Sequence, residues 1–315
     1  MSPIRQPTLA DTLRLWALGA IWGSSFLFTE IAVATLPPLS VAAGRIALAA
    51  CIVLGVAIAL GQKLPRSRAE WAAIAGSGLF GIAMPFGLIS WGQTEVNSSL
   101  AAILMGSGPF AALVLSHIFT RDDRFTAAKL GGLLLGFSGV AVLVGDDVLH
   151  GATRLPAQLA IVAAAFCYAA GGVITRRIAH LPTQMAAGLI LLSAACYTIP
   201  LAVLVDRPWE TAASGAPGLE ALGAVIYLGL ASTGVASLIR FQVIRDAGAT
   251  FMAQVNYLVP LFGVFWAWLF LSQRPPLTAW IALALILAGI HVTRRHTGAG
   301  SRQPGKPGGP ATSGR

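Results

Sequence analysis

The sequence predicts an all-α polytopic membrane protein, with ten transmembrane helices arranged as two inverted five-helix repeats. Of the 315 residues, 56% are hydrophobic and 10% are charged, whereas an ordinary soluble domain has roughly 25% charged residues. Long apolar runs recur along the chain, and one membrane crossing takes about 20 apolar residues. We therefore expect lipid, rather than water, to be the main solvent of the folded chain.

Each apolar run is long enough for one crossing. The first, from Leu13, is too long for the apolar part of a cleavable signal peptide and leads directly into further runs, so we expect it to remain as helix one. The predicted helices span residues 13–35, 38–60, 70–92, 97–119, 127–145, 155–177, 182–205, 219–241, 249–272 and 276–295.

These helices divide the chain into four parts. The predicted parts are a cytoplasmic N-terminal segment, two five-helix units and a cytoplasmic tail, at 1–12, 13–147, 155–295 and 296–315. The tail is rich in Gly and Pro and poor in apolar side chains, so it cannot bury enough surface to fold and is predicted to be disordered.

Basic residues predict the orientation. With a cytoplasmic N-terminus, most loop Lys and Arg fall on the cytoplasmic side, and the outer loops hold only Arg154, Arg207 and Arg274. Cytoplasmic loops carry an excess of Lys and Arg, so both termini are expected in the cytoplasm and the protein in the plasma (inner) membrane. The net charge of +9 forms no single basic face, which argues against a nucleic-acid partner.

The two halves of the chain resemble each other. The segment that begins SLAAILMGSGPF aligns with the one that begins TFMAQVNYLVPL, so that Pro109 matches Pro260 and Gly139 matches Gly289; LPPLSVAAGRIALAAC likewise resembles LPTQMAAGLILLSAAC. Five crossings are an odd number, so the second half must enter the membrane from the opposite face. Such inverted repeats are associated with alternating access.

Pro109 and Pro260 lie near the middle of the fourth and ninth predicted helices. A proline inside a helix removes one backbone hydrogen bond and frees a carbonyl, which hydrocarbon tolerates only where protein or a wet cavity satisfies it. Paired interruptions in two repeats point to a central binding site. The alternative is that both prolines only kink helices for packing.

Three further side chains are candidates to line a central cavity. Asn256 lies one turn before Pro260, and Trp22 and Tyr168 occupy similar places in the middle of helices one and six. A buried amide in lipid needs a partner, which a substrate or a neighbouring helix can supply. The aromatic faces favour a cation or an apolar body, with core packing as the alternative.

Two charges, Glu30 and Arg45, lie well within predicted crossings. Both are six or seven residues from the outer ends of helices one and two, which at 1.5 Å per residue is a shared depth of roughly 10 Å. Either charge alone would be costly there, so a mutual ion pair is expected. The functional alternatives are an outer gate, or Glu30 as a proton carrier that releases Arg45 to a substrate carboxylate.

Two kinds of short motif have less specific interpretations. Gly19–Gly23 and Gly132–Gly136 are small-xxx-small faces that could seat a neighbouring helix, which within one chain of ten helices is more often intramolecular than a dimer partner. Asp122 and Asp123 form the one cytoplasmic carboxylate pair that could hold a metal, but a metal enzyme would want a second acidic cluster on that face. The pair is interpreted as a solvated loop, and no metal, cofactor or enzymatic activity is expected.

Several motifs in order resemble a known family. Two five-helix halves, WGSSF in helix one, an Arg in helix two, a Pro in helix four and a Gly-rich fifth helix are similar to the EamA-type permeases of the drug/metabolite transporter superfamily, over residues 11–295. Many relatives carry Glu-Arg after helices four and nine, whereas this chain has Asp123-Arg124 and Gln273-Arg274. The resemblance implies export of amino acids or related metabolites.

The expected activity is that of an alternating-access carrier for small neutral or zwitterionic metabolites. The predicted helices place no charged residue at the midplane, which argues against phosphorylated substrates, because these need cationic clamps. The alternatives are an uptake permease for sugars or nucleobases, an intramembrane enzyme or a lipid scramblase. Proton coupling through Glu30 and facilitated exchange both stay open, as do a monomer and a homodimer in the lipid bilayer.

Overall fold

The computed structural model describes residues 6–119, 126–149, 154–210 and 218–295. The predicted tail at 296–315, the loop with Asp122 and Asp123, and residues 1–5 of the N-terminal segment lie outside these ranges. The first half of the chain contains α1 (Leu9–Val33), α2 (Pro38–Ala59), α3 (Arg68–Gly78), η1 (Leu79–Ala83), α4 (Met84–Gly92), α5 (Ser98–Met105), α6 (Gly108–Phe119) and α7 (Ala127–Leu149).

The second half repeats this order. It contains α8 (Leu155–Thr175), η2 (Arg176–Ile178), α9 (Thr183–Val205), α11 (Leu219–Tyr227), η3 (Leu228–Val235), α12 (Ala236–Ala247), α13 (Ala249–Met252), α14 (Val255–Leu271) and α15 (Leu277–Arg295). Among the described residues, nine helices are long and apolar enough to cross a membrane, and a shorter apolar helix spans Leu277–Thr293. The predicted all-helical membrane fold is confirmed.

Helix α1 begins earlier than the apolar pattern predicts. It starts at Leu9 instead of Leu13, because the Thr8 hydroxyl accepts a hydrogen bond from the Asp11 backbone N–H and the Asp11 carboxylate accepts one from the Thr8 backbone N–H. Such a capping box satisfies the free N–H groups of a first helical turn. Hydropathy does not reveal this turn, because its charged residues interrupt the apolar run.

The corresponding helices α2 and α9 pack side by side and run antiparallel. At one end, Gln62 donates to Gln184 at 2.8 Å and accepts from the Met185 backbone N–H at 2.9 Å. At the other end, Asp206 accepts from the Ser40 backbone N–H and hydroxyl at 2.6 and 2.9 Å. The start of each helix thus lies beside the end of its counterpart, as an inverted repeat requires.

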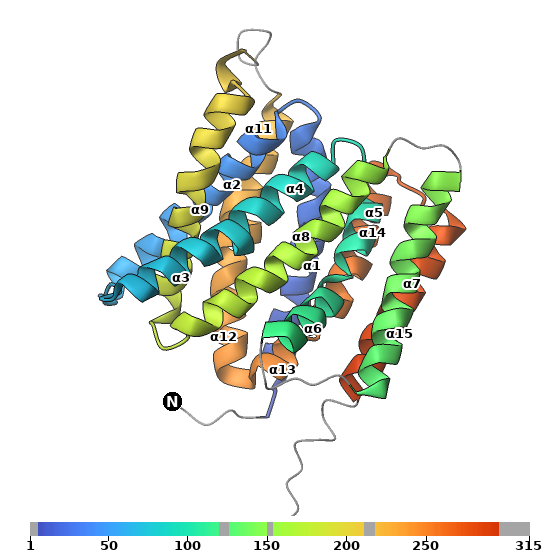
Figure 1. Cartoon of the computed structure of the whole chain (residues 1–315). Coiled ribbons are helices and arrows are strands. Elements are labelled where there is room, and N and C mark those ends of the chain that lie inside the picture. The colour runs from blue at the N-terminus through green and yellow to red at the C-terminus, as the bar shows by residue number, and fades with distance from the viewer. Residues whose placement is uncertain (1–5, 120–125, 150–153, 211–217, 296–315) are drawn as a thin grey trace, which may run out of the picture.

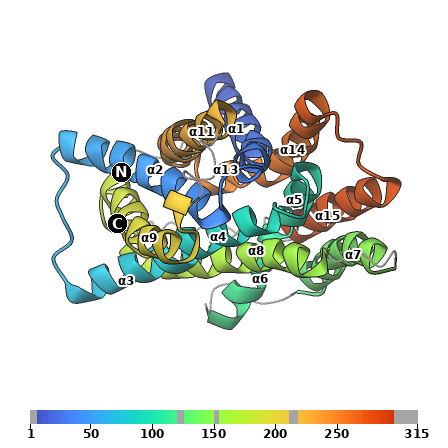
Figure 2. The same ribbon diagram turned by 90° about the horizontal axis from the view of Figure 1, so that it is seen from above.

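The other matching pair, α7 and α15, is also antiparallel and forms one edge of the molecule (Figures 1 and 2). A Cβ on Gly132 would lie 2.7 Å from the Gly289 carbonyl oxygen, and one on Gly139 would lie 2.7 Å from the Ala282 carbonyl oxygen. Helix α15 therefore sits in backbone contact with the glycine face of α7. The expected intramolecular use of the Gly132–Gly136 motif is confirmed.

The Gly19–Gly23 motif is used in the same way, between the halves. Cβ atoms on these two glycines would lie 2.6 Å from the Cβ atoms of Leu258 and Phe262 of α14. Helices α1 and α14 therefore pack closely, with α1, α4 and α8 between the α2–α9 pair and the α7–α15 pair (Figure 2).

Two π-helical segments, η1 and η3, interrupt the third and eighth crossings at corresponding places. The apolar pattern of the sequence does not predict them. A π-helical turn widens the helix and is frequent at functional sites. The glycines that begin this region correspond as well: Gly78 packs against the Ile190 carbonyl of α9, and Gly229 packs against the Arg45 carbonyl of α2.

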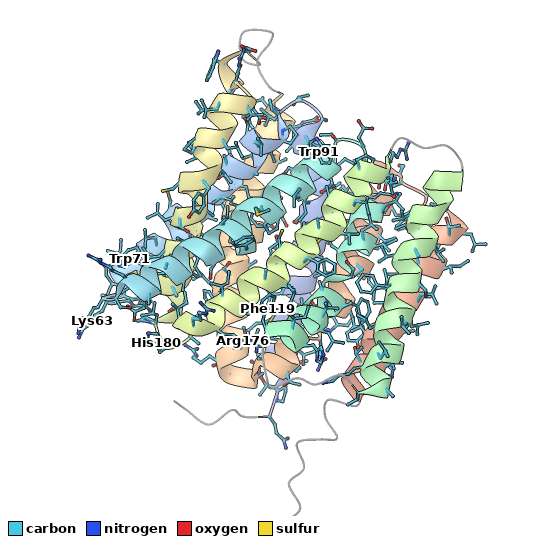
Figure 3. All side chains as sticks on the ribbon, in the orientation of Figure 1. Lys63, Trp71, Trp91, Phe119, Arg176 and His180 are labelled. Atoms are coloured by element: carbon cyan, nitrogen blue, oxygen red, sulfur yellow. The ribbon has the colours of Figure 1, made fainter. Side chains whose placement is uncertain are left out.

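The two ends of the bundle differ in the residues they present. Lys63 and Arg176 lie at one end of the molecule and Trp91 at the other (Figure 3). His180, at the same end as Lys63, lies 2.8 Å from the Glu70 carboxylate. These cations and the Trp91 ring therefore lie at opposite ends of the bundle.

Candidate functional site

Side chains from both halves meet at the π-helical segment η3. The Trp22 indole N–H, in the middle of α1, donates to the Ser232 carbonyl oxygen at 3.1 Å. Nearby, the Ser24 and Tyr227 hydroxyls lie 2.7 Å apart, and the Tyr227 ring packs on Phe28. Trp22 therefore lies at the boundary between the halves, and its role in lining a central site stays a prediction.

Arg45 of α2 also points to η3. Its Nε donates to the Thr233 hydroxyl at 2.8 Å and its Nη2 to the Ser232 hydroxyl at 3.4 Å. The guanidinium carbon lies 3.9 Å from the centroid of the Phe86 ring, a cation–π arrangement. Phe86 in turn makes an edge contact with Tyr168, with ring centroids 6.1 Å apart. One polar and aromatic group thus joins α1, α2, η3, α4 and α8.

The predicted ion pair between Glu30 and Arg45 is wrong for this structure. The Glu30 carboxylate accepts from the Gln273 amide at 2.8 and 2.9 Å and from the Ser98 backbone N–H at 2.6 Å. Counting residues from the helix ends gives depth but not the direction in which a side chain points. Glu30 faces the N-terminus of α5, which favours an anion, whereas Arg45 extends to the hydroxyls of η3.

The position of Arg45 also corrects the expectation of an uncharged midplane. Its guanidinium shares Ser232 with Trp22, which lies in the middle of α1. The polar group at this depth therefore includes one positive charge.

Because the two charges have separate partners, Glu30→Gln and Arg45→Gln are expected to act independently. The change in unfolding midpoint of the double variant should equal the sum of the single changes, with a coupling below about 0.5 kcal/mol. Thermal unfolding of the four purified proteins measures this. If the double variant instead recovers the stability lost by either single variant, the two charges interact, and the ion-pair hypothesis would be supported after all.

The two prolines have different effects on their helices. Pro109 is the second residue of α6, directly after the break at Gly106 and Ser107 that separates α5 from α6. Pro260 is buried inside α14, which continues through it, and the break in that crossing falls at Ala253 and Gln254. The expected interruption is therefore seen at Pro109 but is displaced from Pro260. The two regions meet, since a Cβ on Gly106 would lie 3.4 Å from Pro260 Cγ.

Asn256, one turn before Pro260, is half-buried on α14. Among the described residues, its side-chain amide has no hydrogen-bond partner. Trp22 packs in the same apolar cluster as Val255 and Leu258, the neighbours of Asn256. A role for the Asn256 amide in a central site stays a prediction.

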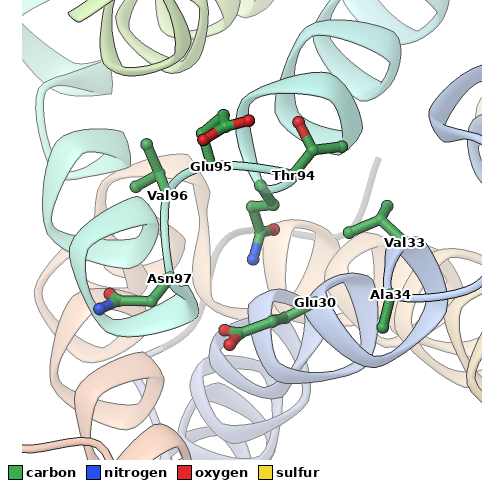
Figure 4. Close-up of a pocket in the computed structure, with 8 residues that line it drawn as sticks. Glu30, Val33, Ala34, Thr94, Glu95, Val96 and Asn97 are labelled. Atoms are coloured by element: carbon green, nitrogen blue, oxygen red, sulfur yellow. The ribbon is translucent and has the colours of Figure 1, made fainter. Parts of the chain in front are cut away.

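Two described cavities lie at the end of the bundle where Trp91 lies, and Glu30 lines both. The smaller, of about 250 Å³, lies between the end of α1 and the loop before α5. Figure 4 shows Glu30 facing Thr94, Glu95 and Asn97 of this loop. The larger, of about 560 Å³, extends from Glu30 towards the start of α11. Neither is lined by the aromatic or proline residues predicted for the central cavity.

Three functional candidates were not predicted from the sequence, namely Ser98, Ser232 and Thr233. Gln273 was noted only as a departure from the relatives, without a role. Ser98 contributes only its backbone N–H, so its side chain gave no signal. Ser232 and Thr233 are adjacent hydroxyls inside the apolar run LGLASTGVAS. Polar residues within a membrane span are expected to pair or to mark a pathway, and this pair could have been singled out on that ground.

The fold and this site define a multi-pass membrane protein of two inverted helical repeats with a polar group between them. The chain belongs to the EamA-like transporter family, whose model matches residues 13–145 and 155–295. A crystal structure of a protein with 22% sequence identity has the same fold, with a TM-score of 0.62, and the match covers 91% of this chain and 98% of that one.

Three curated relatives extend the family assignment. The chain is 27% identical to the uncharacterized inner membrane transporter YedA of Escherichia coli, with 88% of each chain covered. It is 26% identical to a probable terminal-alkyne amino-acid exporter of Streptantibioticus cattleyicolor, over 93% of this chain and 97% of the relative. It is 25% identical to an S-adenosylmethionine/S-adenosylhomocysteine transporter of Chlamydia trachomatis, over 85% and 84%.

Proposed function

We propose that the protein is an alternating-access carrier that exports amino acids or related zwitterionic metabolites across the inner membrane. The observation that carries this proposal is the contact of Trp22 and Arg45 with η3, which joins the two antiparallel halves at a polar group inside the membrane. A carrier of two inverted repeats binds its substrate near the midplane, where the repeats meet. Trp22, Tyr168 and Asn256 line that site in this proposal, and Pro109 and Pro260 shape it.

The contacts of Glu30 support a gate at the outer end. Glu30 on α1, Ser98 at the start of α5 and Gln273 just after α14 are joined by hydrogen bonds of 2.6 to 2.9 Å. We call these three residues the outer clasp. Its bonds connect helices of both halves, so an opening of the bundle at this end must break them. In this proposal the outer clasp holds the carrier closed to the outside, with both termini in the cytoplasm.

The relatives support the substrate class. One is described as a probable amino-acid exporter and another as a transporter of S-adenosylmethionine and S-adenosylhomocysteine. These compounds share an amino-acid group with both a positive and a negative charge. The single guanidinium of Arg45, among aromatic rings, suits a substrate of this kind better than a phosphorylated one, which would need several cationic donors.

Counterflow in proteoliposomes tests the proposal. Liposomes loaded with one unlabelled compound, taken in turn from amino acids, sugars and nucleobases, should accumulate the labelled form of an amino acid and not of the other classes. Counterflow limited to sugars or nucleobases would replace the amino-acid proposal with uptake of those compounds. Absence of counterflow for every solute, together with movement of labelled lipid, would instead indicate a scramblase.

Asn256→Ala is expected to reduce this counterflow. Its amide is half-buried on α14 with no partner among the described residues, so it is available to a substrate, and loss of one such hydrogen bond is worth about 1 kcal/mol or roughly a fivefold rise in KM. The exposed Gln254, at the break just before α14, provides the control variant Gln254→Ala. Unchanged kinetics in Asn256→Ala, at normal expression, would remove Asn256 from the site.

A further inference from the structure

Arg45 is a buried cation without a carboxylate partner. Its exposed fraction is 7%, and it lies in a membrane-spanning helix. None of the carboxylates in the described ranges lies within 4.0 Å of its guanidinium. Charged residues inside a membrane almost always pair with one another or face a pathway. Arg45 has no such pairing in this structure, so the cause of its presence must be sought in what the site binds.

The guanidinium also has donors to spare. An arginine has five N–H donors in a rigid fork, and the described contacts of Arg45 use one on Nε and one on Nη2. Both acceptors are hydroxyls, which carry no charge. The Nη1 donors have no partner among the described residues. A planar fork with unused parallel donors matches the two oxygens of a carboxylate.

The internal repeat provides a comparison that separates packing from binding. Gly229 of η3 packs against the Arg45 carbonyl, and Gly78 before η1 packs against the Ile190 carbonyl. Arg45 and Ile190 are therefore counterparts, and the third and fourth residues after each glycine correspond as well. Ser232 and Thr233 in one half then match Gly81 and Ile82 in the other.

This comparison indicates that the helix packing can form without an arginine at the position of Arg45. The equivalent positions of the other half carry Ile190, Gly81 and Ile82, none of which is a cation or bears a hydroxyl. The Ser193 hydroxyl, which packs against Gly78 there, donates to backbone carbonyls. The arginine and its two hydroxyl partners occur in one half only. Their presence costs desolvation of a charge, whereas the equivalent position of the other half carries the apolar Ile190.

We propose that Arg45, held by Ser232 and Thr233, is a carboxylate-binding subsite for a monocarboxylate substrate. The inference rests on the proposed central site and names the group recognised there. A single guanidinium balances one negative charge, and the next arginine on the same crossing, Arg240, lies eight residues after Ser232, about 12 Å along the helix. The widened turn of η3 presents both hydroxyls to the guanidinium. The rings of Phe86 and Tyr168 border it and suit an apolar or cationic remainder of the substrate.

Thermal unfolding of the full-length protein in detergent tests this subsite. The probes are the twenty common L-amino acids, acetate, pyruvate and benzoate, each beside its amide, which keeps the shape and removes the charge. At about 100 times its Kd, at least one acid should raise the unfolding midpoint by about 4 °C or more, while its amide should not. Arg45→Met should lose this rise, and Arg240→Met, which removes a cation outside the subsite, should keep it.

The unfolding temperature without ligand is a second measurement. A structural role of Arg45 would lower this temperature in Arg45→Met, whereas a role in binding alone would not. Because burial of a charge is costly and the equivalent position of the other half is the apolar Ile190, Arg45→Met without ligand should unfold at the wild-type temperature or above it. A lower midpoint would mean that Arg45 stabilises the fold and would overturn the proposal. So would an equal rise with acid and amide, a rise that persists in Arg45→Met, or no rise with any acid.

Counterflow measurements distinguish a failure of the proposed subsite from a failure of the proposed carrier function. If the protein binds an acid through Arg45 but moves no solute, the carboxylate subsite is supported and the proposal of a carrier is rejected. If the protein moves a sugar or nucleobase equally well with and without Arg45, the proposal of a carrier is supported and the carboxylate subsite is rejected.

Discussion

Gly132→Leu is expected to prevent α7 and α15 from packing. A Cβ at position 132 would lie 2.6 Å from Thr293 Cγ2 and 2.7 Å from the Gly289 carbonyl oxygen, so the larger side chain must push the two helices apart along most of their contact. Membrane helices have no hydrophobic effect to hold them together and depend on close packing. We expect a loss of about 3 kcal/mol, the upper end of the usual range for overpacked cores. The measurements are the yield of folded protein and its unfolding midpoint in detergent.

The neighbouring residue provides a matched control. A Cβ on Gly131 would meet no atom within 4 Å, so Gly131→Leu adds the same side chain to the same helix without touching α15. It should fold like the wild type. If the two variants lose the same stability, the cause is helix propensity or insertion, and the glycine contact between α7 and α15 does not hold the fold.

Much of the fold could be predicted from the sequence because few backbone structures can cross a lipid bilayer. Backbone groups in hydrocarbon must be bonded within helices, so apolar runs report helices directly. The helix α2 begins at Pro38, as predicted, and α5 begins at Ser98, one residue from the predicted start. The match of Gly139 with Gly289 placed α7 and α15 as equivalents. The start of α1 was missed because it depends on the capping pair Thr8 and Asp11, which hydropathy does not detect.

The site was less predictable because it depends on direction as well as depth. Glu30 and Arg45 were placed at one depth, yet one extends to α5 and the other to η3. A helical sequence gives the face of each residue only while the helix is regular, and η3 changes the register by its wider turn. Ser232 and Thr233 therefore reach Arg45 through a geometry that the residue pattern does not contain.

The structure gives a physical reason for the glutamine at position 273, where the sequence departs from its relatives. Gln273 stands where a resemblance to relatives suggested a carboxylate. In the structure its amide donates to both oxygens of Glu30 and its carbonyl oxygen accepts from the Ser99 backbone N–H. A glutamate there would face Glu30 with a second negative charge and could not donate. The amide is therefore the form of this side chain that closes the outer clasp.

A covalent link across the outer clasp is expected to abolish transport. With Cys51, Cys167 and Cys196 replaced by alanine, cysteines introduced as Glu30→Cys and Gln273→Cys can be joined by a short bifunctional thiol reagent that a reductant cleaves. Alternating access requires the outer end to open in every cycle, so the linked protein should show the counterflow of protein-free liposomes. Reduction should restore the activity measured before linking.

Two comparisons make this result specific to the link. Each single-cysteine variant carries the same reagent at one position without joining α1 to the segment after α14, and it should keep the counterflow it has before treatment. The double variant before treatment shows what the loss of the Glu30 and Gln273 hydrogen bonds does alone. Since those bonds close the outer end, their loss should favour the outward-open state and change KM more than it changes the maximal rate. Full counterflow in the linked protein would mean that these helices do not separate during transport, and the outer clasp would then be a fixed structural contact.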